Sequence, residues 1–346
     1  MIFYIVLYLS FLLFCILQLV YKLRFPKMSL FFMGALIFFS GVRVDTGIDY
    51  RAYLDIWNYI DPIDKIERFI LIAVEPGFVF LTSLIKYFTD KSVYFYLITS
   101  LLAILPIYPT LLKLNIKYKI ISFFIYFLVF YITYPFNGIR QGIAMGIFIF
   151  SLPLILNRKF FLVLLLTIVA TLIHTTGLLI IVSYFAIYFN IKVKYFFIIG
   201  LIFSLICWKL DILNYILFNY LGVSDVYSEL FTESTSVFQI ITRTLLIGLL
   251  FYFGIKLNSP IYNKLLMLYM LGFFIYIALF DHNLLATRFN MFFRLLEVIM
   301  VPMLLEKTKN IPTRLVLFLI FLIPFTYSFS QSLQIKENEY HLEFNF

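Results

Sequence analysis

Residues 136–150, FNGIRQGIAMGIFIF, begin with a polar turn and continue as an apolar run that decides how the rest of the chain is interpreted. The apolar run extends to about residue 156, and a helix needs roughly 20 such residues to cross a bilayer. Arg140 and Gln141 stand at its start, and an arginine costs up to roughly 3 kcal/mol at the centre of a membrane, less near the interface. The stretch therefore predicts a membrane-spanning helix with an anion at its mouth.

The composition of the whole chain agrees with this interpretation. Of its 346 residues, 63% are hydrophobic and 13% are charged, and the mean hydropathy is +1.01. We therefore predict an all-α, polytopic helical integral membrane protein in which residues 1–346 form a single membrane domain. The net charge of +9 lies mostly in short connectors, which indicates orientation signals and lipid headgroup contacts and argues against a nucleic acid partner.

The basic connectors set the expected topology. Placing lysine and arginine in the cytoplasm gives about twelve crossings and two polar outer loops, at about residues 43–68 and 211–236. The segment 69–88 does not fit, because a crossing there would place the basic connector at 113–119 outside. We expect this segment to be re-entrant or interfacial, since its Glu75 and Pro76 are tolerated best where the backbone lines a polar cavity.

With this topology, the polar residues near the spans gather on one side of the membrane. The residues at outer ends of spans or in outer loops are Arg43, Asp45, Asp49, Arg140, Gln141, His174, Asp281, His282 and Arg288. The cytoplasmic connectors hold little besides lysine, arginine and turn residues. Any chemistry of this chain is therefore expected to face outward.

Several common catalytic motifs are absent from the sequence. It has no phosphate-binding loop of the GxxxxGKS or GxxxxGKT type, no GxGxxG, no HExxH, no CxxC and no DxD. Nucleotide hydrolysis, Rossmann cofactors, zinc hydrolysis and metal-dependent sugar-nucleotide transfer therefore lack their usual residues. We predict a reaction that uses no metal and no cofactor.

Arg140 and Gln141 form the first candidate site. They open the helix that starts near Gly138, where free backbone N–H groups and a guanidinium together suit a phosphate. The alternative is an arginine that reaches the outer lipid headgroups. The outward position weakens this alternative, because orientation bias places most such arginines inside.

His174 and the first outer loop supply further candidates. His174 ends its span within ATLIHTTG; it is either a hydrogen-bonded core residue, a general base for a sugar hydroxyl, or a donor to a phosphate oxygen. Arg43, Asp45 and Asp49 form a mixed-charge cluster around a glycine that permits a turn. These charges are either solvated, or a carboxylate among them binds glycan hydroxyls or acts as a base. Glu75 reaches the same space if its segment re-enters from outside.

Two arginines near the end of the chain differ in their expected roles. Arg288 and Arg294 are six positions apart, so at about 100° per residue they do not share one narrow helix face. Arg294 has the i, i+3 spacing of a neutralised pair with Glu297 inside the bundle. Arg288 is therefore the better anion ligand, and Asp281 and His282 are secondary candidates.

These motifs occur together, in order, in a known family. They are GVRVDTGIDYRAY from residue 41, EPGF from 75, FNGIRQGIAMGIFIFSL from 136, LIHTTGL from 172 and RFNMFFRLLEVIMVP from 288. Over about residues 43–302, the chain resembles the EpsG/Wzy family of bacterial polysaccharide polymerases. The segment around Glu75 departs from a tidy topology, which leaves the location of that carboxylate open.

The resemblance implies a metal-independent glycosyltransferase that polymerises undecaprenyl-diphosphate-linked oligosaccharides at the outer face of the bacterial inner membrane, making O-antigen, capsule or exopolysaccharide. On this basis we expect the catalytic base to be His174 or Asp49, and the diphosphate ligands to be Arg140, Gln141, Arg288 and Arg43. Secondary candidates are Asp45, Glu75, Asp281, His282 and Arg294.

The expected partners are the lipid-linked oligosaccharide and membrane lipids, with a chain-length regulator and a flippase as further candidates. The alternative function is a transporter or flippase of the same lipid-linked oligosaccharide. A carrier is expected to show ionisable groups at mid-depth and paired broken helices in two similar halves, and the sequence shows neither. A membrane acyltransferase is a third option, which an acyl-donor assay would test.

Overall fold

The computed structural model describes residues 2–65, 74–188, 191–213, 215–216 and 237–342. This part of the chain is helical, and its extended backbone pairing is limited to one isolated bridge between Arg43 and Leu342. The helices group into two compact units, which are treated separately below: unit 1 is Met1–Val182 with Val301–Phe346, and unit 2 is Ser183–Met300. The all-α prediction is confirmed; the single membrane domain stays a prediction.

The described residues contain five helices that are long and apolar enough to cross a membrane. They are Ile2–Tyr21, Ser92–Lys113, Ile139–Leu156, Pro260–Ala278 and Ile311–Leu333. Shorter apolar helices accompany them. A polytopic helical protein is therefore supported, whereas the predicted count of about twelve crossings is not confirmed.

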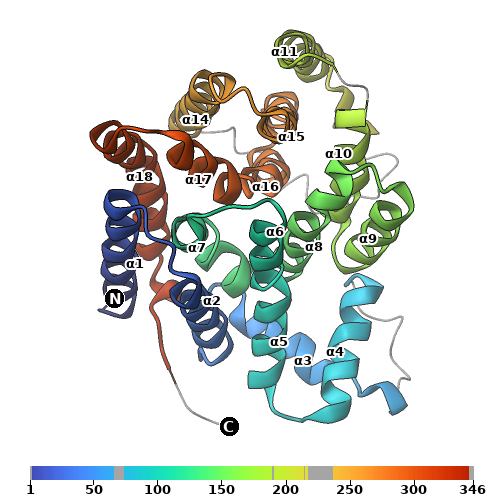
Figure 1. Ribbon diagram of the computed structural model, residues 1–346. Coiled ribbons are helices and arrows are strands. Elements are labelled where there is room, and N and C mark those ends of the chain that lie inside the picture. The colour runs from blue at the N-terminus through green and yellow to red at the C-terminus, as the bar shows by residue number, and fades with distance from the viewer. Residues whose placement is uncertain (1, 66–73, 189–190, 214, 217–236, 343–346) are drawn as a thin grey trace. The chain divides into compact units, whose positions relative to one another are not determined.

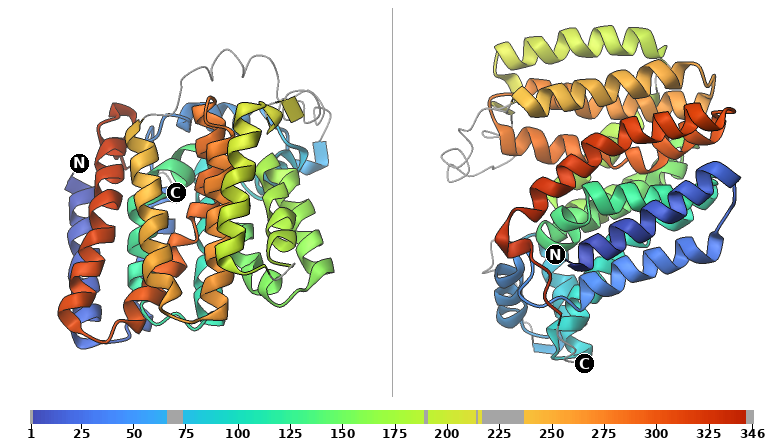
Figure 2. Two further views of the ribbon diagram at one scale, coloured as in Figure 1. Left: turned by 90° about the horizontal axis from the view of Figure 1, so that it is seen from above. Right: turned by 90° about the vertical axis from the view of Figure 1, so that its left-hand side faces the viewer.

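Unit 1 contains most of the helices (Figure 1). Their bounds are α1 Ile2–Tyr21, α2 Pro26–Gly41, α3 Tyr50–Tyr59, α4 Pro76–Phe88, α5 Ser92–Ile104, α6 Ile107–Lys113, α7 Lys119–Val129, α8 Ile139–Leu156, α9 Phe160–Ile173 and α18 Ile311–Leu333. α1 and α18 pack against each other although they are distant in sequence, and both views of Figure 2 show them close together. The chain passes between the units within α10 (Leu179–Tyr188) and α17 (Glu297–Lys307).

One end of unit 1, which we call the basic end, consists of the connectors 22–25, 114–118 and 308–310. The backbone N–H groups of Lys117 and Tyr118 donate to the Glu306 carboxylate, and the Arg314 guanidinium donates to the carbonyls of Leu19 and Thr308. These three connectors, which the sequence predicts on one side, therefore lie together. Their cytoplasmic orientation stays a prediction.

The opposite end, which we call the loop end, consists of the loop 42–49, the turn 132–138 and the tail 336–342. The tail runs along the loop: Val44 N–H donates to the His341 carbonyl, and Gly47 N–H donates to the Glu337 carbonyl. Gly47 has φ +106°, and a Cβ there would lie 2.7 Å from the Asn137 side-chain oxygen. The turn that the sequence predicts at this glycine is confirmed, and only glycine fits it without strain.

The helix that carries Arg140 follows an unusual turn. Residues Ile132–Asn137 form a π-helical turn that contains Pro135, and proline cannot donate a backbone hydrogen bond. Gly138 then caps α8, close to the start that the sequence predicts. Such π-type turns are frequent at functional sites, and this one places the first turn of α8 at the loop end.

α4 is short, and Figure 1 shows it with α3 beside α5. Its start lies against the end of α9, because a Cβ on Gly77 would lie 2.7 Å from the Leu172 carbonyl oxygen. Near its end, the Lys86 ammonium donates to the carbonyls of Trp57 and Ile60, which close α3. α5 and α6 then continue from the loop end to the basic end, with a break at Pro106.

Unit 2 contains α11 Val193–Lys209, α14 Val237–Ile255, α15 Pro260–Ala278 and α16 Asn283–Arg294. α15 contacts α11, α14 and α16. Its start is fixed by Ser259, whose hydroxyl accepts the Tyr262 N–H, and by Pro260 in the first turn. The apolar stretch 289–305 consists of parts of two helices, because the chain breaks at Leu295 and Leu296 between α16 and α17.

Candidate functional site

Arg140 lies in the first turn of α8 and forms an ion pair with Glu75, the residue that precedes α4. The Arg140 side chain is 27% exposed and the Glu75 side chain 19%. Only one guanidinium nitrogen makes this bond, and Nε is buried without a hydrogen-bond partner. The arginine therefore keeps donor capacity at the start of a helix, an arrangement suited to phosphate.

Four helices place this pair. Tyr53 of α3, Phe78 of α4, Ile139 of α8 and Ile173 of α9 belong to one buried core cluster. α3 presents Tyr50, Tyr53 and Trp57 on one buried face, the spacing of an amphipathic helix. The Tyr53 hydroxyl lies 3.5 Å from the Arg140 backbone nitrogen. This packed cluster therefore fixes the position at which Arg140 and Glu75 meet.

His174 follows Ile173 directly and caps the short 3-10 helix Thr175–Leu178. Its Nδ1 accepts the Thr176 backbone N–H at 3.2 Å and lies 2.8 Å from the Thr176 hydroxyl oxygen. A backbone N–H only donates, so Nδ1 carries no proton and the neutral ring is protonated at Nε2. In this tautomer His174 is a hydrogen-bond donor through Nε2.

Arg43 is buried at the loop end, with 1% of its surface exposed. It donates to the backbone carbonyls of Ser40, Thr46 and Phe136. Its Cζ lies 4.7 Å from the ring centroids of both Tyr96 and Phe136. Burial lowers the pKa of this guanidinium, and nearby tyrosines oppose the shift. The geometry is that of an arginine that holds the loop, so a role as diphosphate ligand stays a prediction.

The acidic residues of the loop differ in setting. Asp45 accepts two hydrogen bonds from Arg51, at 2.9 and 2.8 Å, and both side chains are more than half exposed. The hydrogen bonds from Arg51 lower the pKa of the Asp45 carboxyl. Asp49 precedes α3, and its backbone N–H lies 3.4 Å from the Asn137 side-chain oxygen.

The structure therefore gathers several predicted residues at the loop end of unit 1, namely Asp49, Glu75, Arg140 and His174. Gln141 is buried in the first turn of α8. The predicted loop 43–68 is described as far as residue 65. Most of the second predicted loop, 211–236, lies outside the described residues.

The remaining candidates belong to unit 2. Arg288 lies within α16, and Asp281 and His282 immediately precede it. The Asp281 carboxylate accepts the Trp208 indole N–H at 2.9 Å. Arg140 and Arg288 thus belong to different units, and binding of one diphosphate by both stays a prediction.

The pair predicted between Arg294 and Glu297 is confirmed. Arg294 Nε lies 2.8 Å and Nη2 3.2 Å from the two oxygens of Glu297, and the Tyr269 hydroxyl donates to the same carboxylate at 2.7 Å. Glu297 is fully buried. Each charge is satisfied within the protein, so a role of Arg294 in substrate binding stays a prediction.

The EpsG family matches the chain from residue 27 to residue 342. The chain belongs to the EpsG family. EpsG is a Wzy-type polysaccharide polymerase family, so the resemblance inferred from the motifs is confirmed. No curated protein and no solved structure matches the chain.

Membership of the EpsG family supports a polysaccharide-polymerase type of function with glycosyltransferase-like activity. It also suggests lipid-linked oligosaccharides as substrates and, with the apolar helices, a multi-pass membrane protein.

Sequence reasoning missed two residues of this EpsG-family protein. Tyr53 lies within a polar loop in the sequence, and its placement against Arg140 depends on the packing of α3. Arg243 is the lone charge within the apolar stretch 237–255, where an ionisable residue is by itself a sign of function. That second signal was available from the sequence alone.

Proposed function

We propose that this EpsG-family protein transfers a growing glycan from an undecaprenyl-diphosphate donor to the terminal sugar of a second lipid-linked repeat unit. The reaction takes place at the outer face of the bacterial cytoplasmic membrane, which is the side of the loop end. The observation that carries the proposal is the ion pair between Arg140 and Glu75. It combines a cation that keeps an unused donor with a carboxylate that is partly exposed.

In the proposed step, a hydroxyl oxygen of the acceptor sugar attacks the anomeric carbon of the donor glycan. The bond from this carbon to the diphosphate oxygen breaks, and undecaprenyl diphosphate leaves. Arg140 binds the diphosphate, and its interaction strengthens as negative charge develops on the leaving group. One charge-assisted hydrogen bond of about 1.5 to 3 kcal/mol accounts for roughly one to two orders of magnitude in rate.

The proton of the acceptor hydroxyl needs a base. We assign it to Glu75, because this carboxylate lies beside the proposed diphosphate ligand, and Asp49 is the second candidate. We assign His174 another role that the sequence left open, that of a donor to a phosphate oxygen. With its proton on Nε2, it donates to a phosphate oxygen instead of accepting a proton.

The path of α4 supports the proposed position of Glu75. α4 starts beside the end of α9 and ends beside the end of α3, and α5 with α6 supplies the long helix that follows. We therefore propose that residues 74–88, the described part of the segment 69–88, do not cross the membrane and that they present Glu75 from the outer side. Carboxylates and broken helices at membrane depth are tolerated where they line a polar cavity.

The test is polymer formation from purified lipid-linked repeat units by the reconstituted protein. Arg140→Gln is expected to lower the rate by about tenfold to a hundredfold and to shorten the chains. Arg51→Gln is the matched control, because Arg51 is exposed and its ion pair among the described residues is with the exposed Asp45. Normal chain length in Arg140→Gln, with membrane insertion equal to wild type, would contradict the assignment.

The same reconstitution separates polymerase from carrier. Polymer formation without movement of the lipid across the bilayer supports the proposal. Movement of the lipid-linked unit without any polymer would replace it with the transporter or flippase alternative.

A further inference from the structure

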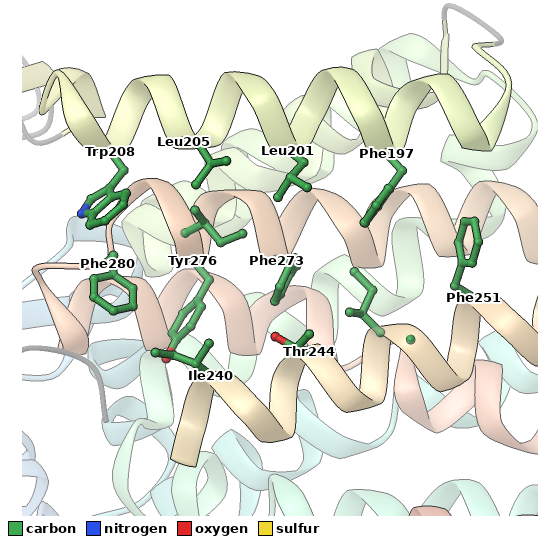
Figure 3. A pocket seen from close by; sticks show the side chains of 13 residues that line it. Phe197, Leu201, Leu205, Trp208, Ile240, Thr244, Phe251, Phe273, Tyr276 and Phe280 are labelled. Carbon is green, nitrogen blue, oxygen red and sulfur yellow. The ribbon is translucent and has the colours of Figure 1, made fainter. Parts of the chain in front are cut away.

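Unit 2 contains an apolar cavity of about 430 Å³ between α11, α14 and α15. Figure 3 shows it extending from Trp208 and Phe280 at one end to Phe197 and Phe251 at the other. Its volume is about three times that of the ~150 Å³ apolar cavity that accepts one benzene ring, so it holds on the order of 15 to 20 carbon atoms. We call this cavity the α14 groove.

The α14 groove is lined on one side by a single face of α14. Ile240, Thr244, Ile247 and Phe251 lie on this face, and at 100° per residue Arg243 lies at its edge. Helical side chains lean toward the N-terminus, so Arg243 extends toward the end of the groove that holds Trp208. The groove is therefore apolar along its length and has a cation beside one end.

Arg243 is buried, with 5% of its surface exposed, and its Nε has no hydrogen-bond partner. Its guanidinium lies 3.8 Å from the ring centroid of Tyr276, which also lines the groove. Its other contacts are neutral: Nη2 donates to the Thr287 hydroxyl at 3.1 Å, and Nη1 lies 3.5 Å from the Gln239 amide oxygen.

The ion pairs found among the described residues leave Arg243 without a carboxylate partner. A buried charge with no counter-charge is costly, so the site calls for an anion. Thr287, its hydrogen-bond partner, directly precedes Arg288, the arginine that the sequence predicts to bind diphosphate. An anionic group at this end of the groove would therefore meet Arg243 next to a second arginine-bearing turn.

We propose that the α14 groove binds the single hydrocarbon chain of a polyisoprenoid phosphate and that Arg243 binds its phosphate. The proposal rests on the proposed function, whose reaction needs two lipid-linked substrates, and it assigns one of their lipids to unit 2. A membrane phospholipid fits less well, because it carries two chains and the groove holds on the order of 15 to 20 carbons, about three or four isoprene units of one chain.

Gly248 offers a specific way to close the groove. It lines the cavity, and a Cβ added there would meet nothing within 4 Å. Gly248→Leu therefore adds apolar volume to the groove from a position whose Cβ has open space around it. Gly34→Leu is the matched control, because Gly34 lies within the apolar helix α2 of unit 1 and also has open space around its Cβ position.

The experiment counts bound lipids on the full chain by native mass spectrometry, with C55 polyprenyl phosphate as probe. The uncharged C55 polyprenol and phosphatidylglycerol are the comparison lipids. We expect Arg243→Gln to weaken one polyprenyl phosphate site at least tenfold while polyprenol binding is unchanged. Gly248→Leu is expected to weaken both polyprenyl lipids, and Gly34→Leu neither.

The lipid count separates this inference from the proposed function. If both hold, the wild type binds two polyprenyl phosphates, and Arg140→Gln and Arg243→Gln each remove a different one. If only the α14 groove is a site, the wild type binds one, which Arg243→Gln removes and Arg140→Gln does not. Unchanged binding in both Gly248→Leu and Arg243→Gln would overturn the inference, as would equal competition by phosphatidylglycerol at this site.

Discussion

Two arginine–glutamate ion pairs, one in each unit, differ in how fully their hydrogen-bonding groups are satisfied. Arg294 and Glu297 form two hydrogen bonds with each other, and Tyr269 completes the carboxylate. Arg140 and Glu75 share one bond, remain 27% and 19% exposed, and leave Nε of the arginine unused. The first pair is closed within the protein, whereas we propose that the second accepts a substrate.

The two pairs therefore differ in hydrogen-bond saturation as well as in burial, and we propose that saturation is what separates a structural pair from a functional one. Removing one partner of a saturated pair lowers the stability of the protein, because the other charge stays buried. Removing one partner of an unsaturated pair next to solvent is expected to lower activity with little loss of stability. Substitutions on the two pairs should therefore move different measurements.

The largest effect is expected for Glu75→Gln. Removing a general base typically lowers a rate by about 10²- to 10⁴-fold, so polymer formation should fall by this amount while the thermal unfolding temperature in detergent changes little. Combining it with Arg140→Gln should give less than the sum of the two losses, because the residues act on one step. A rate within threefold of wild type would assign the proton to Asp49 instead.

Glu297→Gln should act on stability. It leaves the buried Arg294 charge without its counter-charge, which costs about 3 to 5 kcal/mol when such a pair is broken. We expect a clearly lower unfolding temperature and less protein in the membrane. Glu337→Gln, at an exposed position of the tail, is the control. Normal stability of Glu297→Gln would place this pair among the functional ones.

A smaller effect is expected for His174. His174→Ala removes a donor to phosphate and should lower the rate by about tenfold. His174→Gln keeps an amide donor, so its rate should fall by less. A general base would behave differently, since glutamine cannot accept the proton. Equal inactivity of both variants, with normal insertion, would therefore restore the base role for His174.

The smallest effect is expected at the exposed pair of Asp45 and Arg51. Because its pKa is lowered in the folded protein, Asp45 stabilises the fold above its ordinary pKa near ~3.9 and loses this contribution as the pH falls through the lowered value. Asp45→Asn should therefore lower the unfolding temperature only slightly, and by the same amount at pH 6 and pH 8, because the carboxyl is ionised at both. A lowering that differs between these two pH values would mean that the pKa of Asp45 is not lowered in the folded protein.

The sequence predicted what depends on local pattern. The limits of α1 and α14 agree with its apolar runs, Gly138 caps α8, and the spacing of Arg294 and Glu297 gave their ion pair. These features follow from composition and from contacts within a few residues. The break between α5 and α6 also has a local cause, which is Pro106. The continuous apolar run at 92–112 hides this break in the sequence.

The site depended on contacts between distant segments. Glu75 meets Arg140 across 65 positions, and no periodicity in one segment encodes that meeting. The same holds for Arg43, whose carbonyl partner Phe136 lies 93 positions away. The gathering of residues at the loop end was predicted from topology, but which cation faces which anion required the structure.

The tail 336–342 also bears on how orientation should be mapped by reporter fusions. Its carbonyls accept the N–H groups of Val44 and Gly47, and the Asn338 carboxamide lies 3.3 Å from that of Asn137. A reporter that replaces these residues would strip the first loop of its backbone partners and distort the side it is meant to report. A tag inserted within the loop, with the tail kept, gives the cleaner assay.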